Sequence, residues 1–317
     1  MAAPPNVRTY TKITGTPDYD DPTFWDTKFA TGRDVGEWLN SGEMLIDAVV
    51  SHLESRSATN PRVLHLGPGI SKLGVKLCDE FIKRNWAGNG IVNVDFSAEA
   101  VRLGQETESK RDPSHAMGWV QANLRSWADV SRLALSSPFD VILDKSTSDA
   151  IATSPPVTFP LPSDASSTCP MVQEIVDKHG AIELSPVELL GLHLAPLVQK
   201  GALWVTLSYS TTRFDNLSHM AQYWTVVSRT PFKAPQGETS SFAYAPEVFH
   251  WMYILQRNGT IATDNGIGYL PHGAINNASV RPDETGREGV LVSTVSQVFT
   301  AELHYVTSRQ FVVDKIP

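Results

Sequence analysis

Short apolar runs alternate with amphipathic stretches through the first half of the chain. Four runs have the length and composition of buried strands: 62–66, 91–95, 119–122 and 139–144. Three stretches carry apolar residues at helical spacing: 41–56, 71–84 and 98–108. Ser71 and Ser97 stand where helix N-caps are expected. Strands that alternate with helices in this way predict a parallel sheet covered by helices on both faces.

The second half of the chain predicts one more helix and three more strands. Ser185 and Pro186 open a helix that runs to about residue 200, and Glu188 completes a capping box with Ser185. The three further strands are expected near 202–209, 223–227 and 248–256, the last two as an antiparallel pair. The fold class is therefore α/β, with a doubly wound, mostly parallel sheet of seven strands.

Three segments lie outside this pattern. Residues 1–21 are rich in Pro, Thr and Asp and are expected to form a flexible lead-in. Residues 153–180 hold five prolines among Ser and Thr and predict a long inserted loop. Residues 258–317 are expected to form a C-terminal extension packed on the same domain. The stretch 22–40 shows little periodicity, although we expect it to belong to the same domain as the sheet, which ends near residue 257.

Composition narrows the classes of partner and compartment. The 317 residues include 26 Lys and Arg against 34 Asp and Glu, a net charge of −8. This acidic balance argues against a nucleic-acid or membrane partner. Two cysteines cannot build a disulfide scaffold or a cysteine-rich zinc site, and the histidines lack metal-ligand spacing. The N-terminus has no apolar signal-peptide core, so a cytoplasmic location is expected.

Candidate chemistry begins where the first two predicted strands end. Gly67-Pro68-Gly69 follows the first strand, and glycine lets backbone approach a ligand closely. Lys72 stands where a dinucleotide fingerprint needs its third glycine, which disfavours a pyrophosphate. Asp95 ends the next strand, where an acid can accept hydrogen bonds from ribose hydroxyls. The alternative reading of Asp95 is a helix N-cap.

Two further polar groups follow the third and fourth strands. Asn123 and Leu124 can bracket an adenine ring, or they can form an ordinary turn. The run from Asp144 to Asp149 brings two acids and three hydroxyl groups to the carboxyl edge of the sheet. Open α/β folds bind their ligands at that edge, although a solvated loop has a similar composition.

These segments, VLHLGPG, IVNVDFS and FDVILDKSTSDAI, together resemble the class I S-adenosylmethionine-dependent methyltransferases. The chain is more narrowly similar to the eukaryotic group that contains the elongation-factor lysine methyltransferases. That group has a Trp-containing N-terminal motif and Asp-Lys-Gly-Thr-x-Asp-Ala after the fourth strand. The resemblance covers residues 22–257 and implies a Rossmann-like methyltransferase domain with S-adenosylmethionine as cofactor.

The resemblance also implies which residues bind the cofactor: Trp25, Trp38, Gly67, Gly69, Asp95, Phe96, Asn123, Leu124 and Lys145. The resemblance implies that the two tryptophans close over the cofactor, that Asp95 holds the ribose and that Lys145 lies near the sulfonium. The alternative for the tryptophans is a role as core anchors. Three residues depart from the family pattern. Asn123 stands where the family has an acid, Ser146 where it has a glycine, and Pro68 where it has a small residue or Cys.

Methyl transfer from a sulfonium requires the protein mainly to position a nucleophile and strip it of water. Asp144 and Asp149 are the candidates for orienting an acceptor amine, and Tyr209 is a weaker one. The insertion and the tail are long enough to roof a pocket, which favours a small molecule or modified peptide as acceptor. The resemblance favours a protein lysine. A third alternative is a noncatalytic binding protein on the same fold.

Overall fold

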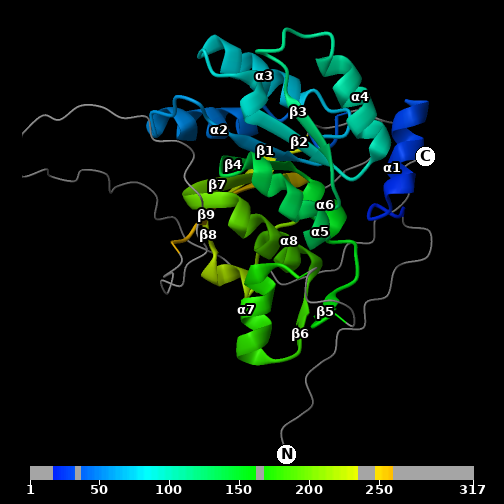
Figure 1. Cartoon of the computed structure of the whole chain (residues 1–317), viewed down its shortest axis with the longest axis vertical. Helices are drawn as coiled ribbons and strands as arrows, with labels where there is room; N and C mark the ends of the chain where they lie inside the picture. Colours follow the sequence, from blue (N-terminus) through cyan, green and yellow to red (C-terminus); the bar gives the residue numbers. More distant parts are fainter. Residues whose placement is uncertain (1–16, 33–36, 162–167, 235–246, 260–317) are drawn as a thin grey trace, which may run out of the picture. The chain divides into compact units, whose positions relative to one another are not determined.

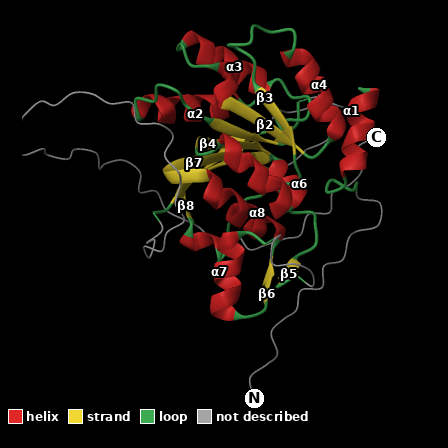
Figure 2. Cartoon of the chain, in the orientation of Figure 1, coloured by secondary structure: helices red, strands yellow, loops and turns green. Residues whose placement is uncertain are grey.

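The sheet of the computed structural model has seven strands in the order β3-β2-β1-β4-β7-β9-β8 (Figures 1 and 2). The structure describes residues 17–32, 37–161, 168–234 and 247–259. The strands are β1 (Val63–Leu66), β2 (Ile91–Asp95), β3 (Gly118–Gln121), β4 (Phe139–Lys145), β7 (Val198–Ser208), β8 (Trp224–Lys233) and β9 (Phe249–Arg257). Neighbours from β3 to β7 are parallel, whereas β9 is antiparallel to both β7 and β8. The predicted doubly wound, mostly parallel sheet is confirmed.

The register of β1 brings three strand ends to one edge. Leu66, its last residue, is paired with Val94 of β2 on one side and with Asp144 of β4 on the other. The chain winds outward from β1 to β3 and then returns to place β4 on the opposite side of β1. Such a reversal leaves a crevice at the carboxyl ends of the strands, where open α/β folds bind ligands.

Helices cover both faces of this sheet (Figure 1). On one face, α2 (Glu43–Ser55) and α3 (Leu73–Lys83) bury Leu45 and Leu77 against β1, β4 and β7. On the other, α8 (Pro186–Leu194) is buried along its whole length in a second core cluster. The short elements α5 (Trp127–Val130), η1 (Gly88–Gly90), η2 (Ser131–Ser136), η4 (Ala195–Leu197) and η5 (Met220–Gln222) connect the larger ones.

Helix capping follows the sequence prediction in part. The Ser97 hydroxyl accepts a hydrogen bond from the Ala100 N–H at the start of α4 (Ala98–Glu108). The Ser185 hydroxyl caps α8 in the same way. The side chain of Glu188 does not close a capping box, because its carboxylate accepts from the His219 N–H at 2.7 Å. The buried Glu188 therefore fastens the loop before β8 onto α8.

A helix that the periodicity did not reveal lies within 22–40. The Asp21 side chain caps α1 (Pro22–Thr31), and Pro22 occupies its first turn. The helix has no continuous apolar stripe, which is why periodicity did not predict it, and none of its residues is fully buried. The local signal was the Asp-Pro pair, since an N-cap acid before proline is typical of a helix start.

The predicted loop at 153–180 is wrong at two places within its described residues. It contains β5 (Val157–Phe159) and α7 (Pro170–His179), and β5 pairs antiparallel with β6 (Ile182–Leu184). Val172 and Ile175 of α7 are buried in the same cluster as α8. Pro170 starts α7 instead of breaking structure, because the first helical turn needs no N–H donor from it.

The proposed lead-in and tail lie mostly outside the described residues. The helix predicted to reach residue 200 ends at Leu194, and β7 begins at Val198, before Gly201. No helix in the described part of the chain combines the length and the apolar character needed to cross a bilayer.

Candidate active site

A pocket opens at the carboxyl ends of β1 to β4. About 1240 Å³ of space lies within it when the solvent at its open mouth is counted. Its lining includes every residue that the resemblance connects with the cofactor: Trp25, Trp38, Gly67, Gly69, Asp95, Phe96, Asn123, Leu124 and Lys145. Asp149 and Tyr209 also line it, and Asp144 does not.

Gly67 and Gly69 form the floor of the pocket between β1 and α3. Both have left-handed backbone, with φ of 50° and 51°. A Cβ on Gly67 would lie 2.4 Å from Oγ1 of Thr147, and one on Gly69 would lie 2.8 Å from the Phe29 ring. Glycine is therefore required at both positions by neighbouring side chains as well as by conformation. The result is bare backbone facing the pocket.

Asp95 connects this floor to the next strand. Its Oδ2 accepts a hydrogen bond from the Gly69 N–H at 2.9 Å, and its Oδ1 accepts from the Ser97 N–H at 2.9 Å. Burial raises the pKa of Asp95 to about 6, against the opposing effect of these backbone donors. An ionised carboxylate has about four acceptor positions. Asp95 thus stabilises the loop and retains acceptor capacity toward a diol in the pocket.

The far end of the pocket lies beyond β3. Leu124 is buried there, while Asn123 is exposed at the rim. The Asn123 side-chain oxygen accepts a hydrogen bond from the Arg125 N–H at 3.0 Å. The group that Asn123 retains for a ligand is consequently its NH₂ donor. A purine ring nitrogen can accept a hydrogen bond from that donor.

The segment from Tyr19 to Trp38 supplies aromatic side chains to one wall of the pocket. Trp25 stacks on Phe29 with ring centroids 5.6 Å apart, and Phe29 in turn lies over Gly69. Trp38 donates from Nε1 to the Ser146 hydroxyl at 3.2 Å. Asp26 holds the helix in place by accepting from the Glu99 N–H at 3.1 Å. Trp25 and Trp38 are partly exposed pocket residues here, not buried anchors.

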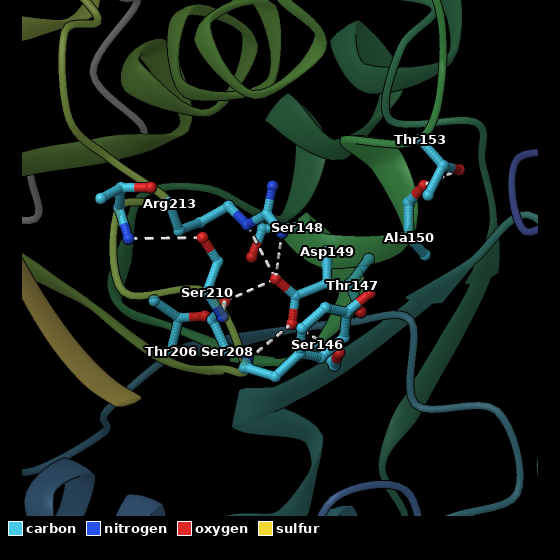
Figure 3. A network of polar contacts seen from close by, with 12 residues as sticks. Ser146, Thr147, Ser148, Asp149, Ala150, Thr153, Thr206, Ser208, Ser210 and Arg213 are labelled. Carbon is cyan, nitrogen blue, oxygen red and sulfur yellow. Dashed lines mark hydrogen bonds and ion pairs between the residues drawn. The ribbon is translucent and has the colours of Figure 1, made fainter. Parts of the chain in front are cut away.

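Asp149, on α6 (Thr147–Ile151), is the centre of a polar network between β4 and β7 (Figure 3). Its carboxylate is 1 % exposed and lies 2.6 Å from Nη2 of Arg213. It also accepts from the hydroxyls of Ser146 and Ser208. Both carboxylate oxygens are therefore engaged, and Arg213 balances the charge. Asp149 fixes the end of β7, and with it Tyr209, against α6.

Ser146 adopts a φ of 68°, a value that usually selects glycine. The family pattern that the sequence resembles has glycine at this position. Its hydroxyl compensates by donating to Asp149 at 2.7 Å and accepting from Trp38. The departure from the family pattern thus joins the aromatic wall to the Asp149 network.

The structure does not bring Asp144 to the pocket. Its carboxylate is fully buried, where it accepts from the Thr147 N–H at 2.8 Å and the Thr206 hydroxyl at 2.9 Å. Burial raises its pKa to about 6. The expectation that Asp144 orients an acceptor amine is corrected to a structural role, because its oxygens hold the first turn of α6.

Sequence reasoning missed Glu37. One of its carboxylate oxygens lies 2.5 Å from the Lys145 ammonium, and the carboxylate also accepts from Ser71 Oγ and the Lys72 N–H at 2.7 and 2.8 Å. Burial acts to raise the pKa of Glu37, but the Lys145, Lys72 and Ser71 donors outweigh it and hold the pKa below its ordinary value. Nothing in the aperiodic stretch around Glu37 signalled this contact.

His65, on β1, also lines the pocket. Its Nδ1 lies 2.8 Å from the Asn93 side-chain oxygen. Burial lowers the pKa of His65 to about 4, so the imidazole is neutral near pH 7.

Known proteins resemble this chain to different degrees. No family model matches it. The methyltransferase srdJ of Neurospora crassa is 25% identical over 240 residues, which cover 76% of this chain and 84% of that protein. A methyltransferase structure from Anabaena variabilis shares 12% identity with a TM-score of 0.46, over 79% of this chain and 99% of that one. Magnesium protoporphyrin IX methyltransferase from Synechocystis shares 11% identity with a TM-score of 0.42, over 78% of this chain and 100% of that one.

The residues of the pocket fit an adenosyl sulfonium. Asp95 offers carboxylate acceptors at the end of β2, bare glycine backbone lies at the end of β1, and apolar Leu124 lies beyond β3. The strand order, this pocket and the fungal relative lead to one conclusion. The chain is an S-adenosylmethionine-dependent methyltransferase with the class I fold.

Proposed function

We propose that the enzyme methylates an amine nitrogen of a small molecule or modified peptide. The observation that carries this proposal is the continuity of the pocket. The same cavity that contains Asp95 and Gly67 extends to Tyr209 and to the aromatic residues Tyr19 and Trp25. One cavity thus holds both the residues proposed to bind the cofactor and aromatic side chains that can exclude water from an acceptor.

The cofactor supplies an activated methyl group on a cationic sulfur. In this proposal, Asp95 binds the ribose hydroxyls, Phe96 and Leu124 contact the base, and the Gly67 and Gly69 backbone admits the amino-acid part. Trp25 and Trp38 cover the site. These contacts orient the acceptor and cofactor for in-line displacement, which is the main contribution a protein makes to this reaction.

An amine must lose its proton before it can attack. Asp149 is a poor candidate for the base, because Arg213 and two serine hydroxyls already engage its carboxylate. The pocket instead favours the neutral amine through desolvation by its aromatic wall and through the nearby Lys28 ammonium. Burial and the Asp149 charge raise the pKa of Tyr209, so its phenol stays protonated and its oxygen can accept from the amine N–H.

The support for a small acceptor differs from what the sequence suggested. Ser154 is the only described residue of the insertion that lines the pocket, so β5, α7 and β6 do not roof it. The aromatic side chains of Tyr19, Trp25 and Trp38 cover the pocket instead. A protein lysine is the alternative acceptor, favoured by the Asp-Lys-Ser-Thr-Ser-Asp-Ala motif. Cofactor binding without turnover is the second alternative.

The test is incubation with methyl-labelled cofactor and a cell extract separated by size. Label in the small-molecule or peptide fraction supports the proposal, and label in protein supports the lysine alternative. Binding of cofactor without label transfer in any fraction supports the noncatalytic alternative. The Asp95→Ala variant is the control, because it should abolish specific labelling at low cofactor concentration while leaving background chemistry unchanged.

A further inference from the structure

Lys145 places a positive charge inside the pocket. Its side chain is 4 % exposed, and its ammonium lies 2.5 Å from Glu37 Oε2 and 3.0 Å from the Asn40 carbonyl oxygen. A buried ammonium is costly unless an opposite charge and hydrogen bonds accompany it. Glu37 is the carboxylate that supplies that charge.

The strand order indicates which part of the cofactor would meet this pair. Leu124 follows β3, Asp95 ends β2, Gly67 follows β1 and Lys145 ends β4, in the spatial order β3-β2-β1-β4. With the base near β3 and the ribose near β2, the sulfur and amino-acid part extend toward β1 and β4. The cationic sulfur therefore belongs in the half of the pocket that contains the Lys145 ammonium.

Two positive charges in one partly enclosed site repel each other more strongly than they would in water. The Glu37 carboxylate removes this conflict by pairing with Lys145. Ser71 Oγ and the Lys72 N–H hold the same carboxylate in position from the glycine-loop side. The side chain is 32 % exposed, so solvent moderates its effect without cancelling it.

We propose that Glu37 neutralises Lys145 and so keeps the pocket from disfavouring the charged cofactor relative to its neutral thioether product. With Glu37 in place, the pair presents no net charge to the sulfonium. Without it, Lys145 repels the sulfonium of S-adenosylmethionine but has no such effect on S-adenosylhomocysteine. Glu37 is a specificity-determining residue in this account, which rests on the proposed use of S-adenosylmethionine.

The experiment measures the dissociation constants of both compounds by calorimetry for the full chain and its Glu37→Gln variant. Glutamine keeps the size of the side chain and removes its charge. We expect affinity for S-adenosylmethionine to fall about 10-fold more than affinity for S-adenosylhomocysteine. Glu54→Gln is the matched control, because Glu54 pairs with Arg84 on the surface away from the pocket lining.

A second variant separates electrostatics from structure. In Glu37→Gln/Lys145→Met the unpaired cation is gone, so the ratio of the two affinities should return toward that of the unchanged protein. Equal weakening of both compounds by Glu37→Gln would overturn the proposal and assign Glu37 a structural role. Failure of the unchanged protein to bind either compound would refute the cofactor assignment itself, and the proposal with it.

Discussion

The Asp95 carboxylate accepts a hydrogen bond of 2.9 Å from the N–H of Gly69, 26 residues earlier in the chain. This contact joins the acid at the end of β2 to the loop at the end of β1. The ribose-binding candidate and the glycine floor are therefore one preorganised unit. Any change at Asp95 is expected to affect both its direct hydrogen bonds to ligand and the position of the loop.

Asp95→Ala should weaken binding of S-adenosylmethionine by on the order of 10- to 100-fold. Hydrogen bonds to a charged group contribute about 1.5–3 kcal/mol, which corresponds to that range. Calorimetric titration measures the change, and Asp47→Ala on the exposed face of α2 is the control. An unchanged dissociation constant would show that Asp95 serves only the protein's own loop.

Binding should also weaken as the pH falls below 6. Burial raises the pKa of Asp95 to about 6, so the carboxylate is ionised at pH 7.5 and increasingly protonated below 6. The dissociation constant should rise by up to about 10-fold per pH unit in that range, because protonation removes an acceptor. Titrations from pH 5 to 8 test this, and Asp95→Asn should remove the dependence. A wild-type profile that stays flat would contradict it.

Protonation of Asp95 is not expected to unfold the protein by itself. The folded pKa of Asp95 lies above the ordinary value of 3.8, so protonation of this group favours the folded state. Its contribution to stability is fully present below 3.8 and is lost as the pH rises through about 6. His65, with a pKa of about 4, stays neutral across the titration.

Arg213→Met should destabilise the fold by about 3–5 kcal/mol, because it leaves the buried Asp149 carboxylate without its counter-charge. Chemical denaturation measures the free energy of unfolding. Asp149→Asn/Arg213→Met should recover part of the loss, since the uncompensated charge is then absent. Lys110→Met, which breaks an exposed pair with Glu106, should leave the midpoint nearly unchanged. Equal effects of the Arg213 and Lys110 variants would mean that burial of the Asp149 pair has no energetic consequence.

Ile175→Ala should reduce stability by about 2–5 kcal/mol and leave cofactor affinity intact. Ile175 is 2 % exposed in the core that α7 shares with α8, and truncation of such a side chain leaves a cavity. Thermal unfolding and calorimetry on the same sample separate the two effects. Lys178→Ala, on the exposed side of α7, is the control. If Ile175→Ala lowers cofactor affinity with no loss of stability, α7 contributes to the site and not to the core.

Local pattern predicted much of the sheet and the floor of the pocket. The strand 91–95 and the helix 98–108 coincide with β2 and α4, because their apolar spacing and the Ser97 cap are contained within a few residues. Parallel strands end at a common edge, so Gly67 and Asp95 could be expected to meet before their contact was known. The same local reasoning failed for α1 and α7, where proline starts a helix.

The sequence by itself therefore determined the fold class and the polar residues at the carboxyl ends of the strands. Tertiary structure decided which of those residues face the pocket. Asp144 and Asp149 belong to one short run, but Thr206 of β7 holds the first in the core, while Arg213 pairs with the second at the pocket wall. Glu37 and Lys145 are 108 residues apart. No local spacing encodes such a pairing, because it exists only after Glu37 has packed against Ser71 and Lys72 at the start of α3, beside the end of β4.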